Sequence, residues 1–478
     1  MSPEYHRPVL FRALRVLSSM VLLAAAGCGG YSARQHASGW IIVETANIRV
    51  RTNLSQAKAT EVAADMQNIR DVLARHVLKC AFQGRPDRIP VTLLSASQYE
   101  DIAPEYFAAF YQSSAISWLD DFGGQVVVPD NFGPDARQIF QHELTHHLVA
   151  TCFPAAPIWL TEGMAKFVET ATVGEGKVTF GLPPYAIGLR ARPEVGHMHG
   201  MRVVALPLER LPPLGRVVHL PGAAFHHVST VTGIDMEANY ATAWAAVHLL
   251  TIGADDLHPR FEKFLRGLQQ IGADPEALFA RTFAGEDLQA RLDAYLRAGR
   301  LRLFSGPVPP PRTTPARVHP MTEGEAHLEW AWLWGIVKSE RNREHMREHL
   351  GAAKADPRTR ASAHLLAGKS MAESGDLAGA EREIAEGLAR DPDDARLLVA
   401  RVQLLVARGA PVAELAAAAN RLRRVARSAQ HLCALALVEM MQGDATAGLA
   451  LADRGLALKP SSWFCRKVVE EARKTAGR

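Results

Sequence analysis

The sequence contains no long run of charges of one sign, and its 478 residues carry a formal net charge of +4. Such an even distribution gives no reason to expect nucleic acid or another polyanion as a partner. Beyond its first residues, the chain also lacks any apolar stretch long enough to span a bilayer. Its 48% hydrophobic and 22% charged residues are ordinary for a globular protein, and its length predicts about two to three domains.

The first residues have the pattern of a targeting signal. An arginine-containing segment precedes VLSSMVLLAAAG, which at about twelve residues is too short for a transmembrane helix. Small residues then precede Cys28, which resembles the cleavage site of bacterial lipoproteins, although Ala25 stands where leucine is commoner. We therefore expect residues 1–27 to be a signal peptide, Cys28 to be lipidated, and residues 28–38 to tether the protein in the bacterial cell envelope. An ordinary secretory signal is the alternative.

Cysteine is scarce, with four residues beyond Cys28: Cys80, Cys152, Cys433 and Cys465. An exported chain reaches an oxidising compartment, which permits disulfides. Pairing Cys80 with Cys152 and Cys433 with Cys465 is one of three possible connectivities. Four buried free thiols remain the alternative.

Residues 39–303 alternate between strand-like and helix-like patterns. WIIVETANIRVRT, RIPVTLLS and QVVVPD predict strands, whereas apolar residues from Val62 to Val77 recur at helical spacing. Residues 237–299 hold successive helical patterns separated by glycine or Asp-Pro breaks. The expected fold class is therefore α+β, with an α/β subdomain that leads into a helical one.

A proline-rich segment follows, and we place a linker at residues 304–322. Prolines favour an extended, semi-rigid spacer, so this segment is the clearest domain boundary. The remaining residues, 323–478, are expected to form an all-α domain.

The C-terminal part of the sequence repeats. Gly375, Gly409 and Gly443 stand at equal intervals, and Pro392 and Pro460 are separated by twice the same interval. A helical period of about 34 residues, with such turn positions, resembles the tetratricopeptide family. The resemblance implies stacked helix pairs whose curved surface binds a protein partner. Generic helical hairpins are the alternative.

The stretch QHELTHHLVATC contains the first residues that point to chemistry. His142 and His146 are four positions apart, so on a helix both point the same way and can share one zinc ion. Glu143 then lies beside the metal, where it can accept a proton from the attacking water. Pro134 and Asp135 predict the start of this helix. A surface helix with two histidines by coincidence is the alternative.

The next helix supplies a candidate third ligand. Zinc in catalytic sites is held by three protein side chains and keeps a fourth position open. Pro154 and Pro157 end the first helix, and PIWLTEGMAKFVE then places Glu162 in the first turn of a second one. Two antiparallel helices with a short connection can bring Glu162 to the metal.

HELTH followed by WLTEGMAKFVE resembles the gluzincin metallopeptidases, the peptidase MA-like group with a thermolysin-type catalytic domain. The resemblance implies that His142, His146 and Glu162 hold Zn²⁺, with Glu143 as the general base. It covers about residues 40–300, although its specific motifs occupy only the two helices. No GAMEN-like motif precedes HELTH, which argues against an aminopeptidase.

Two further roles follow from the resemblance. Thermolysin-like members orient a ligand histidine with an acidic residue four positions after the zinc glutamate, but that position is Lys166 here. Glu169 is the candidate substitute, with a solvated helix charge as the alternative. Gluzincins often stabilise the oxyanion with a tyrosine or histidine from a later helix. In NYATAWAAVHLL we expect Tyr240 in this role, with His248 as the alternative.

Three other histidines are expected to have no role in the zinc site. His197 and His199 stand in a stretch flanked by glycine and proline, which is more often a loop than a second metal site. His147 is expected to point away from the metal.

The sequence therefore favours an envelope-anchored zinc endopeptidase that hydrolyses peptide bonds and recruits proteins through its repeats. The rival is a catalytically inactive lipoprotein scaffold that acts through its repeats alone. A purely structural zinc site would have no need for Glu143. The two hypotheses differ in whether Glu143→Gln abolishes function while zinc remains.

Overall fold

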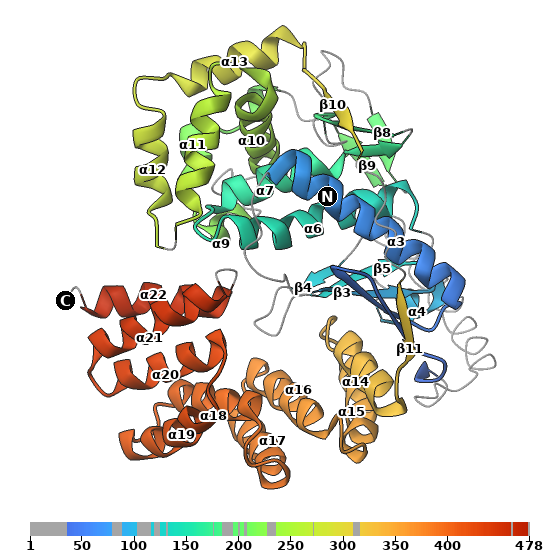
Figure 1. The fold of residues 1–478 in the computed structure, drawn as a ribbon, viewed down its shortest axis with the longest axis vertical. Coiled ribbons are helices and arrows are strands. Elements are labelled where there is room, and N and C mark those ends of the chain that lie inside the picture. The colour runs from blue at the N-terminus through green and yellow to red at the C-terminus, as the bar shows by residue number, and fades with distance from the viewer. Residues whose placement is uncertain are drawn as a thin grey trace, which may run out of the picture.

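The chain folds as a mixed α+β protein with a helical C-terminal region, as the sequence predicts (Figure 1). This computed structural model describes residues 36–78, 88–102, 116–118, 125–130, 132–174, 176–183, 195–198, 201–204, 208–226, 236–270, 272–308, 316–459 and 462–476. The expected signal peptide, Cys28 and most of the expected tether lie outside these residues. Among the described helices, none combines the length and the apolar character needed to cross a membrane.

A six-stranded mixed sheet organises the N-terminal part. Its strand order is β11-β1-β2-β3-β5-β4, with β2, β3 and β5 parallel to one another and the other neighbours antiparallel. The strands are β1 (Ile41–Glu44), β2 (Ile48–Thr52), β3 (Ile89–Leu94), β4 (Ile116–Trp118), β5 (Gln125–Pro129) and β11 (Arg317–Pro320). The three stretches predicted as strands supply β1, β2, β3 and β5.

Helices and two small sheets complete this part. The helices are α3 (Gln56–Leu73), α4 (Ala96–Ile102), α6 (Pro134–Cys152), α7 (Ile158–Glu169), α8 (Leu214–Val218), α9 (Gly222–Phe225), α10 (Met236–His248), α11 (His258–Leu268), α12 (Pro275–Thr282) and α13 (Leu288–Ala298). The small sheets are β10 (Phe304–Pro307) with β7 (Lys177–Phe180) and β6 (Thr172–Gly174), and β8 (Val195–Met198) with β9 (Met201–Val204).

The C-terminal region consists of successive helices. They are α14 (Glu323–Trp334), α15 (Glu340–Ala355), α16 (Arg360–Glu373), α17 (Leu377–Arg390), α18 (Ala395–Ala407), α19 (Val412–Val425), α20 (Ala429–Met441), α21 (Ala445–Leu458) and α22 (Trp463–Ala476). Gly375, Gly409 and Gly443 lie in the turns of three successive hairpins, with φ of 86°, 66° and 90°. Glycine adopts this left-handed conformation without steric cost. The glycine period of the sequence therefore marks the same turn in each of these hairpins.

Different parts of the chain cover the two faces of the sheet. Successive side chains of a strand point to opposite faces. Val126 and Val128 of β5 accordingly pack in the main core with residues of α3 and α6. Val127 points the other way and packs in a second cluster with Trp330 of α14. The first C-terminal helix is thus part of the core that supports the sheet.

A buried polar network also fixes α14 to the sheet. Glu329 of α14 accepts hydrogen bonds from Thr92 and Gln125. Its second carboxylate oxygen lies 3.2 Å from Nη1 of Arg51. A buried carboxylate is stable only with such partners, so removal of any of these contacts would leave a costly unpaired group.

The two ends of the segment 304–322 form strands, whereas residues 309–315, which hold most of its prolines, lie outside the described residues. Its beginning forms β10, which pairs with β7, and its end forms β11, which pairs with β1. Both strands close with proline, at Pro307 and Pro320, and proline is tolerated at the margins of short edge strands. The helical region is therefore fastened to the N-terminal sheets at both ends of this segment.

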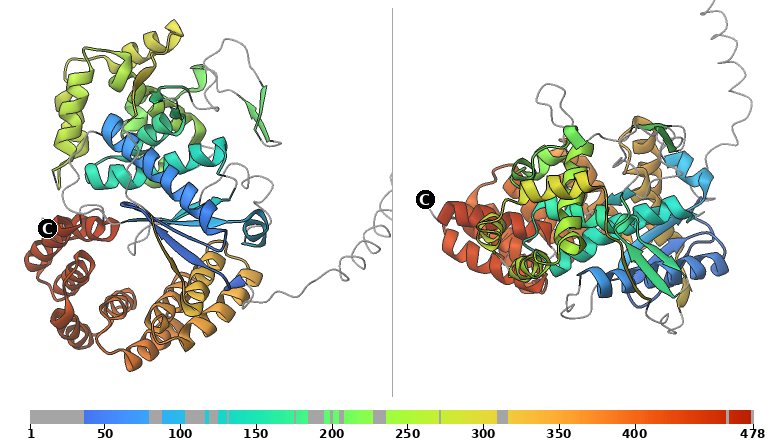
Figure 2. Two further views of the ribbon diagram at one scale, coloured as in Figure 1. Left: turned by 45° about the vertical axis from the view of Figure 1, so that its right-hand side comes forward. Right: turned by 90° about the horizontal axis from the view of Figure 1, so that it is seen from above.

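The helices α14–α22 curve in an arc. In Figure 1 the arc begins with α14 beside the sheet and ends with α22 below α6 and α12, and Figure 2 shows its curvature. A disulfide between Cys433 and Cys465 joins α20 to α22. This bond is one of the two in the connectivity Cys80–Cys152 with Cys433–Cys465. Cys152 is also disulfide-bonded, and its partner lies outside the described residues.

Candidate metal centre

Two helices carry the candidate ligands, and both begin where the sequence predicts. Pro134 opens α6, and Pro157 precedes α7, because proline suits the start of a helix and cannot continue one. The Gln141 amide of α6 donates to the carbonyl oxygens of Glu169 (2.7 Å) and Ala171 (3.2 Å). These bonds fix the end of α7 against α6.

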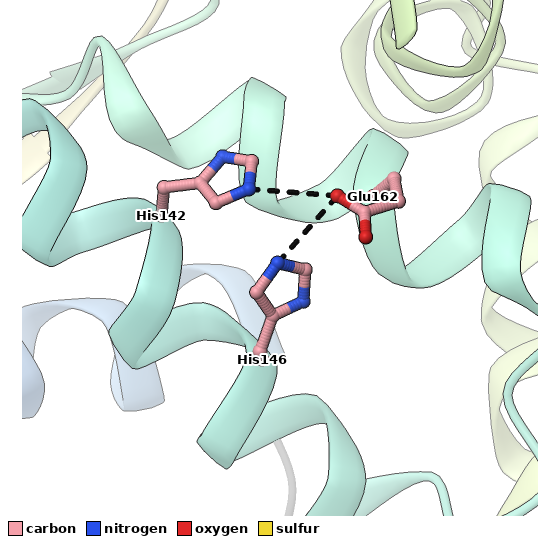
Figure 3. A group of neighbouring side chains, drawn as sticks. All are labelled: His142, His146 and Glu162. Carbon is pink, nitrogen blue, oxygen red and sulfur yellow. Dashed lines mark ion pairs between the residues drawn. The ribbon is translucent and has the colours of Figure 1, made fainter. Parts of the chain in front are cut away.

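The structure brings together His142, His146 and Glu162 (Figure 3). Nε2 of His142 and Nε2 of His146 each lie 3.5 Å from Oε2 of Glu162. A tetrahedral zinc ion with ligands at about 2.0–2.1 Å holds neighbouring ligand atoms roughly 3.4 Å apart. Both histidine–glutamate distances are close to this value, and the three ligand atoms all lie within 4.8 Å of one another. Two histidines and a carboxylate form the donor set of many catalytic zinc sites.

One carboxylate oxygen of Glu162 lacks a hydrogen-bond partner among the described residues, and a bound cation would serve as its partner. Its side chain is 6% exposed, and its Oε2 is buried without a hydrogen-bond partner among the described residues. Burial alone would raise the pKa of this carboxyl, but the imidazoles of His146 and His142 hold it below its usual value. A buried, charged oxygen without a hydrogen bond is costly, so these residues fit a bound metal ion.

Glu169 contacts the ligand histidine His142 in the way expected of the acidic residue that Lys166 replaces in this sequence. Its Oε2 lies 3.0 Å from Nδ1 of His142, the ring nitrogen that faces away from Glu162. Burial would raise the pKa of Glu169, yet the Lys166 ammonium, 3.0 Å away, and His142 hold it low. A carboxylate at this nitrogen fixes the orientation of the imidazole and leaves Nε2 free for a metal. Lys166 here stabilises that carboxylate.

Glu143 lines a cavity together with two of the three candidate ligands. This cavity has a volume of about 1070 Å³ and is also lined by His146, Glu162 and His226. The Glu143 side chain is partly exposed and follows His142 on α6, as the sequence predicts. A carboxylate placed beside the ligands and open to the cavity can reach a substrate and a water.

Tyr240 and His226 stand on the same side of the site. The Tyr240 hydroxyl lies 3.0 Å from Nδ1 of His226, and Nε2 of His226 lies 3.6 Å from Oε1 of Glu162. Burial, together with the charge of Glu162, raises the pKa of Tyr240, so its phenol stays protonated and can donate. No sequence motif indicated His226, because it follows the short helix α9 and only the fold brings it close to Tyr240 and Glu162.

The glycine of WLTEG allows two helices to cross closely. A Cβ atom at Gly163 would lie 2.5 Å from the carbonyl oxygen of Ala243 on α10. The crossing brings α10, which carries Tyr240, against α7, which carries Glu162. The absence of a side chain at Gly163 therefore permits the close approach of the two helices that carry Glu162 and Tyr240.

No protein-family profile matches this chain, and no curated protein matches it. The interpretation of the site therefore depends on its own geometry. That geometry supports a single centre formed by α6, α7 and α10.

His248, the alternative to Tyr240, lies elsewhere. It is fully buried, with Nε2 3.0 Å from the carbonyl oxygen of Gly181 and Nδ1 3.0 Å from the Tyr295 hydroxyl. Burial lowers its pKa to about 4. Both nitrogens are therefore used within the fold, which argues for a structural role.

The other histidines are placed only in part. His147 does not belong to the ligand group, and burial lowers its pKa to about 4. His197 lies on β8, but its side chain, and the whole of His199, lie outside what the structure describes. The expectation that they form no second metal site therefore remains a prediction.

Proposed function

We propose that this protein is a zinc-dependent endopeptidase with a gluzincin-type, thermolysin-like catalytic domain. The observation that carries the proposal is the group of His142, His146 and Glu162, spaced for one ion and containing a buried carboxylate oxygen without a hydrogen bond. Zn²⁺ bound there would polarise a peptide carbonyl and lower the pKa of water.

Side chains of the protein would supply the proton transfer, the stabilisation of the oxyanion and the orientation of a ligand histidine. Glu143, open to the cavity, accepts the proton of the attacking water and passes it to the leaving amine. Tyr240, kept protonated by its surroundings, donates to the oxyanion of the tetrahedral intermediate. His226 holds the tyrosine hydroxyl and is a second candidate donor. Glu169 keeps His142 in the orientation that exposes Nε2.

The helical region would recruit a protein. The three hairpins with regularly spaced glycine turns support tetratricopeptide repeats, whose curved surfaces bind proteins. Because β10, β11 and α14 fasten this region to the sheets, a recruited protein would be held at a set position rather than on a flexible spacer. Lipidated Cys28 would keep the whole protein at the membrane of the cell envelope, with its domains on the extracytoplasmic side.

Peptide hydrolysis by the full-length, zinc-loaded protein tests the proposal. Glu143→Gln should keep zinc and lose about 10²- to 10⁴-fold in kcat, because it removes the general base. Glu386→Gln, an exposed glutamate of α17, is the matched control and should retain full activity. Equal activity in the unsubstituted and the Glu143→Gln proteins would refute the role of Glu143. Absence of hydrolysis in all of them would favour the inactive scaffold.

A further inference from the structure

The cavity at the candidate metal centre has two walls from distant parts of the chain. One wall contains Glu143 and Glu162, and the opposite wall comes from α22 at the end of the helical arc. Arg466 and Glu470 of α22 line the same cavity. The last helix of the chain therefore faces the helices that hold the proposed zinc ligands, and a substrate in this cavity lies between them.

The face that α22 presents to this cavity is basic. Its polar lining residues recur at helical spacing and comprise Arg466, Lys467, Glu470, Arg473 and Lys474. Lys467 and Lys474 both pair with Glu470, at 3.0 and 3.1 Å. Lys474 also pairs with Glu471, and Arg473 lies 3.7 Å from Asp453, so four basic side chains stand against three acidic ones and the wall keeps a net charge of +1.

The position of α22 is fixed from both sides. Its Cys465 forms a disulfide with Cys433 of α20, and its Val468 and Val469 are buried in the apolar core of the C-terminal helices. On the opposite side the Arg473 guanidinium packs on the backbone at Gly272, between α11 and α12. These contacts hold α22 in the position where it lines the cavity.

We propose that α22 is a specificity-determining wall of the substrate cleft, and that its basic face selects polypeptide segments rich in aspartate and glutamate. This inference rests on the proposed peptidase function. An extended substrate that places its scissile bond at Glu143 must run between α6 and α22, so its neighbouring residues meet the basic face. Charge complementarity in a cleft raises both the association rate and the discrimination between substrates.

Binding can be measured without turnover in the full-length Glu143→Gln protein loaded with zinc. The probes are a fluorescein-labelled ten-residue peptide with four glutamates and the same peptide with glutamines. The test variant adds Lys467→Glu and Lys474→Glu, whose ion pairs are exposed and contribute little to folding. The matched control adds Arg424→Glu and Arg454→Glu, which change the net charge equally at exposed positions outside the cavity.

Fluorescence anisotropy should show that the glutamate peptide binds about tenfold more tightly at low salt. The test variant should lose this preference, and the matched control should keep it. Equal binding of the two peptides, or a preference that the test variant retains, would overturn the proposal. If the unsubstituted protein cleaves neither peptide, the peptidase proposal fails, whereas the anisotropy result still decides the role of α22.

Discussion

Two groups of histidine and glutamate side chains in this protein have similar composition and different surroundings. In the first, between α6 and α7, Oε2 of Glu162 has two imidazoles at 3.5 Å and no hydrogen bond among the described residues. In the second, between α16 and α17, His364 lies with Glu383 and Glu386. There the Lys354 ammonium lies 2.7 Å from both oxygens of Glu383.

The two groups differ in the side chains that supply positive charge to the carboxylate. At Glu162 these are the imidazoles of His146 and His142, whereas at Glu383 a lysine ammonium contributes as well. Lys354 and the imidazole of His364, at 2.8 Å, hold the pKa of Glu383 low against the opposing effect of burial. The ammonium therefore already compensates that carboxylate, and a metal ion would have to displace it. No lysine or arginine forms an ion pair with Glu162 within the described part of the chain. Residue type alone does not distinguish a metal site from an ion-pair network.

Removal of one carboxylate from each group gives the largest expected contrast. Glu162→Ala should weaken zinc binding by more than about 100-fold, because even a residue that only orients a ligand contributes 10- to 100-fold. Glu383→Ala should leave zinc content unchanged. Competition with a chelator measures both affinities. Zinc that survives Glu162→Ala would move the third ligand elsewhere.

A smaller effect is expected at the carboxylate behind His142. Glu169→Gln keeps the size of the side chain but removes the charge that orients the imidazole, so zinc affinity should fall by about 10- to 100-fold. The same chelator competition measures this, and thermal unfolding of the zinc-free proteins serves as the control. Unchanged zinc affinity would show that Glu169 does not orient the ligand histidine.

Two helical glycines differ in the space around them: Gly163 lies at the close crossing of α7 and α10, and Gly351 lies at an uncrowded position of α15. Gly163→Ala should lower the free energy of unfolding by about 1–3 kcal/mol, because the added methyl meets the backbone of Ala243. Gly351→Ala in α15 meets no atom within 4 Å and should raise it by up to about 1 kcal/mol. Urea denaturation measures both. Equal effects of the two substitutions would contradict the close crossing.

A pH-dependent effect is expected at two buried histidines, His327 of α14 and His349 of α15. Nδ1 of His349 lies 2.8 Å from Nδ1 of His327, and burial, with the nearby His327, His36 and His345, lowers the pKa of His349 to about 3. Below pH 6.5 the unfolded chain binds a proton here that the folded protein does not. The free energy of unfolding should therefore fall by about 1.4 kcal/mol for each pH unit from 6.5 towards 3.

Urea titrations at pH 7.5, 6 and 5 measure this dependence. His349→Gln should flatten it, whereas His258→Gln, at a partly exposed position of α11, should not. An unchanged slope in His349→Gln would assign the acid sensitivity to other groups.

Local sequence rules were sufficient for much of the site. Helical spacing predicted the shared direction of His142 and His146, and proline positions predicted both helix starts. The glycine period predicted the turns of the hairpins. These predictions hold because each depends on residues within one or two turns of one another.

Other features needed the tertiary structure. The proline content of 304–322 predicts a spacer, and it does not reveal that β7 and β1 each pair with a strand from one end of this segment. Nothing in the sequence around His226 distinguishes it from other loop histidines, and only the packing of α9 and α10 places it beside Tyr240. The sequence favoured Tyr240 and left His248 as the alternative, and burial and hydrogen bonds then assigned His248 a place within the fold.

The sequence by itself determined which atoms could bind a metal and which turns the helices make, because spacing along a helix fixes direction and glycine permits a left-handed turn. Only the tertiary structure decided which of the two histidine–glutamate groups has no ion pair with lysine or arginine among the described residues. It also placed α22 across the same cavity as α6, although most of the chain lies between these two helices in sequence. Contacts between residues so far apart depend on how whole elements pack, and no local pattern encodes that packing.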